Sequence, residues 1–165
     1  MQKVIIIGCP GSGKSTLPKK MHEITHLPVI HLDNLYWNSD KTTVSNEEWM
    51  ARLSYALALD KWIIDGNYAS SMEYRMQASD TIIFFDYPND VCIDRIKRRV
   101  GMKHDDLPLI ETELDDQFLD FVAHFDTDSR ESILHLLHKY KDKNIVILKN
   151  RNDADNYLIQ LSKDC

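Results

Sequence analysis

Near the amino end of the sequence, three glycines are spaced around small residues and lead to a lysine. The stretch Gly8–Ser15 reads GCPGSGKS and fits the pattern G-x-x-x-x-G-K-[ST] at every fixed position. Its glycines allow the backbone to curl around a phosphate group, and Lys14 adds a positive charge. The residues predicted to hold the phosphates of a nucleotide are Gly8, Pro10, Gly11, Ser12, Gly13, Lys14, Ser15 and Thr16.

A glycine-rich turn without a ligand is the alternative interpretation of this stretch. The neighbouring residues favour phosphate binding, because the apolar run Lys3–Ile7 is typical of a buried strand and Ser15–Leu17 can begin a helix. The first turn of such a helix offers unpaired N–H groups and a positive dipole end to an anion. Lys14 is therefore predicted to be catalytic as well as phosphate-binding.

Three aspartates follow apolar runs further along the chain, namely Asp33, Asp65 and Asp86. Ligands of parallel sheets bind beyond the carboxyl ends of the strands, so we expect these carboxylates beside the phosphate loop. Ser15, Asp65 and Asp86 are predicted to bind Mg²⁺, and Asp33 to bind or deprotonate an acceptor hydroxyl. An alternative remains open for each of two aspartates. Asp86 could cap the following helix, and Asp33 could be a solvated loop residue.

Arginines and aromatic residues could complete such a site. Phosphoryl transfer develops negative charge that arginines can stabilise. Arg95, Arg98 and Arg99 lie on one predicted helix. The alternative for Arg98 is that it only interacts favourably with the dipole at the end of this helix. Arg75 and Arg130 stand apart from this helix, and Arg75 is predicted to contact the acceptor. The aromatic side chains predicted to line a pocket for a planar group, together with His31, are Tyr36, Trp37 and Tyr68.

Strands and helices must position these residues. Apolar runs predict five strands, at residues 3–7, 28–33, 61–65, 81–86 and 144–148. Helical spacing predicts helices at 14–25, 45–60, 88–100 and 153–161, a short helix ending at 75, and two helices after 113 with a break near 126–128. Residues 34–43 and 102–113 are predicted loops. Together with the motif at 8–15, the alternation predicts an α/β, three-layer P-loop NTPase fold with a five-stranded parallel sheet flanked by helices.

Length, charge and cysteine content limit the class of protein. The 165 residues fit a single domain, 1–165, and the net charge of −6 argues against direct nucleic-acid binding. The three cysteines are widely separated and are predicted to be reduced thiols. No apolar run reaches 18 residues, so neither export nor membrane anchoring is expected and a cytoplasmic location is predicted. The oligomeric state stays open.

Several segments together resemble a known family. The segments His31–Trp37, Trp62–Tyr68, Arg75–Met76 and Asp80–Asp86 resemble the DNA topology modulation protein (FlaR-related) family of small P-loop kinases. The similarity extends from Val4 to about residue 148. More distantly, Asp65-Gly66 and the segment 94–99 resemble adenylate kinase.

The resemblance implies an adenylate-kinase-like fold that binds ATP and Mg²⁺, with a small helical lid at about 101–130. By the adenylate kinase pattern, Arg95 stacks on the ATP base, Arg99 and Arg130 clamp phosphates, and Asp65 holds the magnesium waters. Adenylate kinase has an arginine shortly after its Asp-Gly pair, whereas none occurs here before Arg75, and its AMP-binding segment is replaced by residues 33–37. Phosphorylation of AMP itself is therefore not expected.

Three hypotheses about function follow. The first is an ATP-dependent kinase for a nucleoside or nucleotide. The second is a kinase for another hydroxyl compound, such as a sugar acid or a shikimate-like acceptor, with Asp33 as the hydroxyl partner. The third is a nucleotide-dependent regulator or DNA-associated protein with little turnover. The family name favours a link to DNA, but the net charge and the absence of a nucleic-acid-binding motif argue against direct contact.

Overall fold

Five parallel strands form the centre of the molecule. We describe them from a computed structural model, which covers residues 1–40, 42–99 and 115–164 but not the side chain of Arg99. The sheet order is β2-β3-β1-β4-β5, with all four strand pairs parallel. The bounds are β1 (Lys3–Gly8), β2 (Val29–His31), β3 (Trp62–Asp65), β4 (Thr81–Phe85) and β5 (Asn144–Leu148). The predicted α/β fold with a five-stranded parallel sheet is confirmed.

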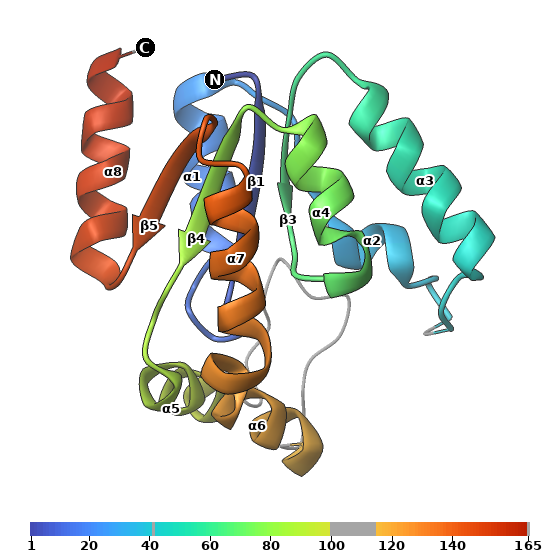
Figure 1. Cartoon of the computed structure of the whole chain (residues 1–165), viewed down its shortest axis with the longest axis vertical. Coiled ribbons are helices and arrows are strands. Elements are labelled where there is room, and N and C mark those ends of the chain that lie inside the picture. Colours follow the sequence, from blue (N-terminus) through green and yellow to red (C-terminus); the bar gives the residue numbers. More distant parts are fainter. Residues whose placement is uncertain (41, 100–114, 165) are drawn as a thin grey trace.

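Helices cover both faces of this sheet. Their bounds are α1 (Thr16–Thr25), α2 (Leu32–Tyr36), α3 (Asn46–Ala58), α4 (Ala69–Ala78), α5 (Asn89–Arg99), α6 (Asp116–Ala123), α7 (Glu131–Lys139) and α8 (Arg151–Asp164), with a π-helical turn η1 (Asp126–Arg130) before α7. Helices α1 and α8 contact each other, while α4 and α7 lie in front of the sheet in Figure 1. Among the described residues, no helix combines the length and apolarity needed to cross a membrane.

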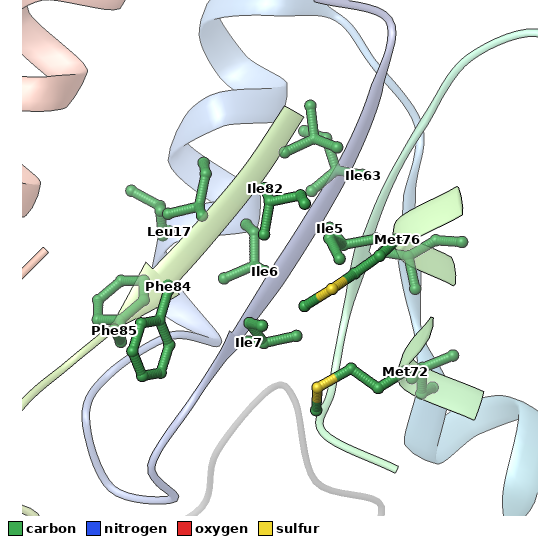
Figure 2. Close-up of a cluster of buried hydrophobic side chains, with 14 of the residues drawn as sticks. Ile5, Ile6, Ile7, Leu17, Ile63, Met72, Met76, Ile82, Phe84 and Phe85 are labelled. Carbon is green, nitrogen blue, oxygen red and sulfur yellow. The ribbon is translucent and has the colours of Figure 1, made fainter. Parts of the chain in front are cut away.

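The central strands are continuous apolar runs because both of their faces are covered. Every residue from Val4 to Ile7 in β1, and from Ile82 to Phe84 in β4, is fully buried. Figure 2 shows Met72 and Met76 of α4 directed toward the sheet. Burial of each such side chain contributes about 1.5–3 kcal/mol to folding. Cys9 and Cys92 are buried free thiols, and Cys165 lies outside the described residues.

The strand register places the proposed site at one edge of the sheet. Gly8 at the end of β1 is level with Phe85 of β4, and His31 of β2 is level with Asp65 of β3. The arrowheads of β4 and β5 point to the end of the molecule where α5 and α6 lie (Figure 1). The phosphate loop and the ends of β2, β3 and β4 therefore meet at the carboxyl edge, as the sequence predicted.

The segment after β2 differs from the prediction, because it is helical instead of a strand to Asp33 and a loop from Asn34. Leu32 begins α2 and is fully buried beneath Gly66, where an added Cβ would lie 2.9 Å from the Leu32 Cβ. Burial of Leu32 folds the chain into one short helix that ends at Tyr36. The predicted loop is confined to the residues beyond it, where Trp37 forms an antiparallel bridge with Thr43.

The break between the last two predicted helices also lies elsewhere. The helix stops at His124, whose backbone leaves helical geometry at φ −103° and ψ 10°, and η1 then continues directly into α7. The carbonyl of His124 accepts the N–H groups of both Thr127 and Asp128, so residues 126–128 remain helical. The predicted loop at 102–113 and most of the predicted lid lie outside the described residues. The part of the lid region that is described forms α6, which packs on α5, and η1.

Ser45 provides a first test of the local structure. Its hydroxyl accepts the N–H of Glu48 at 3.2 Å and caps α3. We expect Ser45→Ala to lower the free energy of unfolding by about 1 kcal/mol, because one amide at the helix start loses its partner. Urea denaturation measures this change. Ser54→Ala, at an exposed position of the same helix, is the control and should change the free energy by less than about 0.5 kcal/mol; an equal loss in both variants would contradict the capping role.

Candidate active site

Two crowded glycines shape the loop after β1. Gly8 has φ +145°, and a Cβ there would lie 2.5 Å from the carbonyl oxygen of Phe85. Gly11 has φ +82°, and a Cβ there would lie 2.5 Å from the carbonyl oxygen of Cys92 in α5. Any larger residue would collide with main chain at both positions. The loop is therefore fixed between the end of β4 and α5, which explains glycine at position 8, fixed in the motif, and at position 11, which the motif leaves open.

Asn67 holds the start of the phosphate loop from the neighbouring strand. Its side-chain oxygen accepts the N–H of Gly8 at 3.0 Å, and its side-chain nitrogen donates to the carbonyl of Gly8 at 2.7 Å. No role was assigned to Asn67 from the sequence, in which it belongs only to the Trp62–Tyr68 segment of the family resemblance. Its partner lies 59 residues away in the sequence, so the local pattern contains no information about this contact.

Arg75 of α4 holds the same turn through hydrogen bonds. Its side chain is fully buried in α4, and its guanidinium donates to the carbonyls of Gly66 at 2.8 Å and Tyr68 at 3.1 Å, and also to that of Asn67. We expected this arginine to contact the acceptor. The structure instead directs its donors to three main-chain carbonyls, which fix the turn after β3.

Lys14 stands between the phosphate loop and the aspartates at the strand ends. The side chain is half-buried. Burial lowers the pKa of its ammonium group, and the negative charges of Asp65 and Asp33 oppose that shift. The lysine therefore lies within the field of both carboxylates, where it can act as a fixed positive charge toward a bound anion.

Two hydrogen-bonded pairs face this lysine. The Nδ1 atom of His31 lies 2.7 Å from Asp65 Oδ1, and the Tyr68 hydroxyl donates to Asp33 Oδ1 at 2.6 Å. Burial, and then the contact with Asp33, raise the pKa of Tyr68 above its usual range, so the phenol keeps the proton that it donates. Each pair joins the β2–α2 segment to the β3–α4 segment.

One cavity of about 710 Å³ brings these groups together. The phosphate loop forms one side of it, the ends of β2 and β3 form the other, and α6 contributes two phenylalanines. The lining residues are Pro10, Gly11, Gly13, Lys14, Ser15, Thr16, His31, Asp33, Trp37, Asp65, Gly66, Asn67, Tyr68, Arg95, Phe118 and Phe121.

A second cavity, of about 290 Å³, lies on the other side of the phosphate loop. Arg95 lines both cavities: its guanidinium donates to the carbonyl of Ser12 at 2.8 Å and lies 5.2 Å from the centre of the Tyr87 ring. Helix α8 closes this cavity with Arg151, Ala154, Asp155 and Leu158. A space beside a phosphate loop, with a guanidinium and an aromatic ring on its wall, can take a planar group.

Solved structures that resemble this arrangement of strands and helices include kinases. The chain is 16% identical to a gluconokinase from Sinorhizobium meliloti, with 99% of this chain and 94% of that chain aligned and a TM-score of 0.58. It is 18% identical to a shikimate kinase from Bacteroides thetaiotaomicron, with 97% and 95% of the two chains aligned and a TM-score of 0.56. The fold is that of the small P-loop kinases. No protein-family model and no curated protein matches the sequence.

Asp86 and Arg130, predicted for the metal and the phosphates, are paired with each other. Arg130 donates to both oxygens of Asp86, through Nε at 2.6 Å and a terminal nitrogen at 2.9 Å. Neither residue is among those that line the two cavities. This ion pair joins the end of β4 to η1. Arg99, the other predicted phosphate clamp, closes α5, but its side chain lies outside the described part of the chain.

The predicted aromatic residues form one cluster, but only part of it reaches the cavity. Tyr36 packs against Trp37, Trp49 and Tyr68, with ring centres 5.7, 5.4 and 5.1 Å away. Trp37 and Tyr68 line the large cavity, whereas Tyr36 does not. Tyr36 therefore supports the two rings that face the cavity.

The residues at the large cavity fit the phosphates of a nucleotide together with Mg²⁺. A hydroxyl from Ser15 and a carboxylate from Asp65 line it beside Lys14. Within residues 1–40, 42–99 and 115–164, no group of three or more His, Cys, Asp and Glu side chains is arranged to hold a metal alone. Magnesium commonly binds through one or two carboxylates, water and substrate phosphates, and Asp65 and Ser15 are protein groups of the kind that it uses.

Proposed function

We propose that this protein transfers the γ-phosphoryl group of ATP to a hydroxyl group of a small molecule, and that the acceptor is a nucleoside or nucleotide. The observation that carries the proposal is a single cavity in which Lys14 of the phosphate loop meets the carboxylates of Asp33 and Asp65. The resemblance of the sequence to the topology modulation protein family and to adenylate kinase supports an enzyme of this kind.

In the proposed reaction, the acceptor oxygen forms a bond to the γ-phosphorus while the bond from that phosphorus to the β–γ bridging oxygen breaks. ADP leaves with the electron pair of the broken bond, and the hydroxyl proton passes to Asp33. Tyr68 occupies Asp33 Oδ1, and no described residue donates a hydrogen bond to Oδ2. Asp33 Oδ2 is thus the proposed acceptor of the proton.

The donor would be held by the phosphate loop and by Arg95. Lys14 and the N–H groups at the start of α1 contact the phosphates, while the smaller cavity takes the adenine ring against Arg95. Ser15 and Asp65 are the proposed magnesium ligands, with Asp65 acting through bound water. Arg99 stays a proposed phosphate ligand, whereas Arg130 would first have to leave Asp86.

A second candidate is a kinase for a non-nucleotide hydroxyl compound, such as a sugar acid or a shikimate-like acceptor. The similarity in fold to a gluconokinase and to a shikimate kinase favours it. Asp33 would have the same role in both reactions. The two candidates therefore differ in the acceptor and share the donor site.

The test is ADP release from Mg-ATP in the presence of nucleosides, nucleoside monophosphates, sugars and sugar acids. We expect release to depend on an acceptor and to be accompanied by a phosphorylated product of that acceptor. Stimulation by nucleosides or their monophosphates alone supports the first candidate, and stimulation by a sugar acid or shikimate alone supports the second. Release without any acceptor dependence, together with salt-sensitive DNA binding, would contradict both.

The metal role of Asp65 predicts a separation of turnover from ATP binding. Asp65→Asn keeps the shape of the side chain but loses its charge, so we expect kcat to fall about 100-fold while the Kd for ATP changes less than about 3-fold. Asp86→Asn is the matched comparison, since Asp86 was the other predicted metal ligand and is paired with Arg130 outside the cavities. Equal kcat for wild type and Asp65→Asn would remove Asp65 from the metal site.

A further inference from the structure

The large cavity has two sides of opposite charge. The phosphate-loop side contains Lys14, and Arg95 lies next to it. On the other side, the charged residues that β2–α2 and β3–α4 place on the wall are Asp33 and Asp65, beside His31. Among the described lining residues, this second side contains no lysine or arginine. An acceptor placed there meets carboxylates on the protein and phosphates on the donor.

The arginines that could reverse this charge are directed elsewhere. Arg75 is fully buried, and its donors are used by the carbonyls of Gly66, Asn67 and Tyr68. Arg52 of α3 donates to the carbonyl of Leu35 at 3.1 Å and pairs with Glu48. Neither arginine lines the cavity. Neither Arg75 nor Arg52 thus provides a cation for a phosphate or carboxylate of an acceptor on this side of the cavity.

The wall of this cavity also has exposed aromatic surface. Trp37 is 42% exposed and Phe121 is 44% exposed, although both line the cavity. Trp37 belongs to the segment after α2 and Phe121 to α6, so the two rings approach the cavity from different elements. Exposed rings at a cavity wall favour a ligand with a flat apolar ring.

From these observations we infer that the acceptor carries no negative charge and is a hydroxyl compound with a flat ring, of the nucleoside type. A nucleoside monophosphate, a sugar acid or a shikimate-like acid would place an anion beside Asp33, Asp65 and the phosphates of ATP. The hydroxyl meets Asp33, and the ring lies against Trp37 and Phe121. This inference rests on the proposed function and selects one substrate class within it.

The test compares acceptors that differ in charge. Phosphorylated product from Mg-ATP is measured with the pairs thymidine and thymidine monophosphate, adenosine and AMP, and glucose and gluconate. We expect kcat/KM to be at least about 10-fold higher for the neutral member of each pair that reacts. The reason is that the carboxylates of Asp33 and Asp65 and the phosphates of ATP repel an anionic acceptor. We expect the nucleosides to exceed glucose, because glucose has no flat ring.

Variants test each half of the inference. Asp33→Asn should lower the neutral-to-anionic ratio of kcat/KM several-fold, even though it slows both reactions, whereas Asp60→Asn at an exposed position outside the cavity should leave the ratio unchanged. Trp37→Ala should raise KM for the nucleosides about 10-fold. The aromatic control is Tyr55→Ala, at a side chain that is 75% exposed on α3. Thermal melting of every variant identifies any loss of folding.

The outcomes separate the inference from the proposed function. Preference for an anionic member, or an unchanged ratio in a folded Asp33→Asn variant, would overturn the inference and leave the kinase intact. An unchanged KM for nucleosides in Trp37→Ala would overturn the part that concerns the ring. No phosphorylated product from any acceptor, while ATP binding persists in calorimetry, would overturn the proposed function and the inference together.

Discussion

Replacing Lys14 with methionine is expected to lower phosphoryl transfer about 1,000-fold, which is the usual scale for the loss of a fixed charge at a developing anion. Lys14 lies in the field of Asp65 and Asp33 and on the wall of the large cavity, where its charge faces a bound anion. Water that enters the space left by the Lys14 ammonium group carries no fixed positive charge, so it cannot restore the rate of phosphoryl transfer.

The stability of this variant should change little. Burial lowers the pKa of the Lys14 ammonium, which means that the folded state already disfavours its charged form. Methionine removes this cost but also removes the countercharge for two aspartates, so the two effects oppose each other. We expect the melting temperature to stay within a few degrees of wild type, and a loss of activity is then assigned to chemistry.

The measurement is single-turnover transfer from Mg-ATP to the best acceptor of the panel, with the Kd for ATP determined separately. Lys141→Met is the control, since Lys141 is exposed in the turn before β5 at the opposite end of the sheet. Transfer by Lys14→Met within about 10-fold of wild type would contradict the proposed role of the phosphate loop.

The central strands were predictable because both of their faces are buried. A strand covered on both faces is apolar along most of its length, and β1, β3 and β4 appear in the sequence as such runs. The edge strand β5 is also an apolar run, although Asn144 and Ile147 are exposed. The predicted bounds of these four strands match the observed ones within one residue. The end of β2 was less predictable. Leu32 is as apolar as the strand before it, and only its packing beneath Gly66 determines that it begins a helix.

The position of the site was predictable, but the partners within it were not. Topology places Gly8, Asp65 and Asp86 at one edge, whatever their side chains contact. Whether Asp65 meets His31, or Asp86 meets Arg130, depends on register and on helix orientation over distances of 34 and 44 residues. Short patterns in the sequence do not record such contacts, and this is why Asn67 was missed.

Arg75 shows how the type of residue can mislead when its burial is unknown. An arginine shortly after a strand end, in a protein expected to bind phosphates, is a reasonable ligand for an anion. The side chain instead reaches from α4 to the turn after β3 and is fully buried. Burial lowers the pKa of Arg75 to about 10, yet the guanidinium remains the donor to three carbonyls.

Removal of that guanidinium should therefore reduce stability more than any other change discussed above. Arg75→Met fills a similar volume but leaves the carbonyls of Gly66, Asn67 and Tyr68 without this donor. Relief of the buried charge offsets part of the loss, so we expect the free energy of unfolding to fall by about 3 kcal/mol. For a chain of 165 residues this corresponds to roughly 10 °C in melting temperature.

Two comparisons distinguish this role from a general effect of losing an arginine. Arg98→Met removes an exposed guanidinium that pairs with Asp94 on α5, and it should change the free energy of unfolding by less than about 0.5 kcal/mol. Arg75→Lys should recover little, because one ammonium cannot reproduce a planar fork that reaches three carbonyls. A melting temperature for Arg75→Met within 2 °C of wild type would contradict the assignment.

The same turn also holds the phosphate loop, because the side chain of Asn67 is hydrogen-bonded to the backbone of Gly8. The Arg75→Met variant should therefore also bind ATP more weakly at temperatures below its melting temperature, which would connect the buried arginine to the phosphate loop.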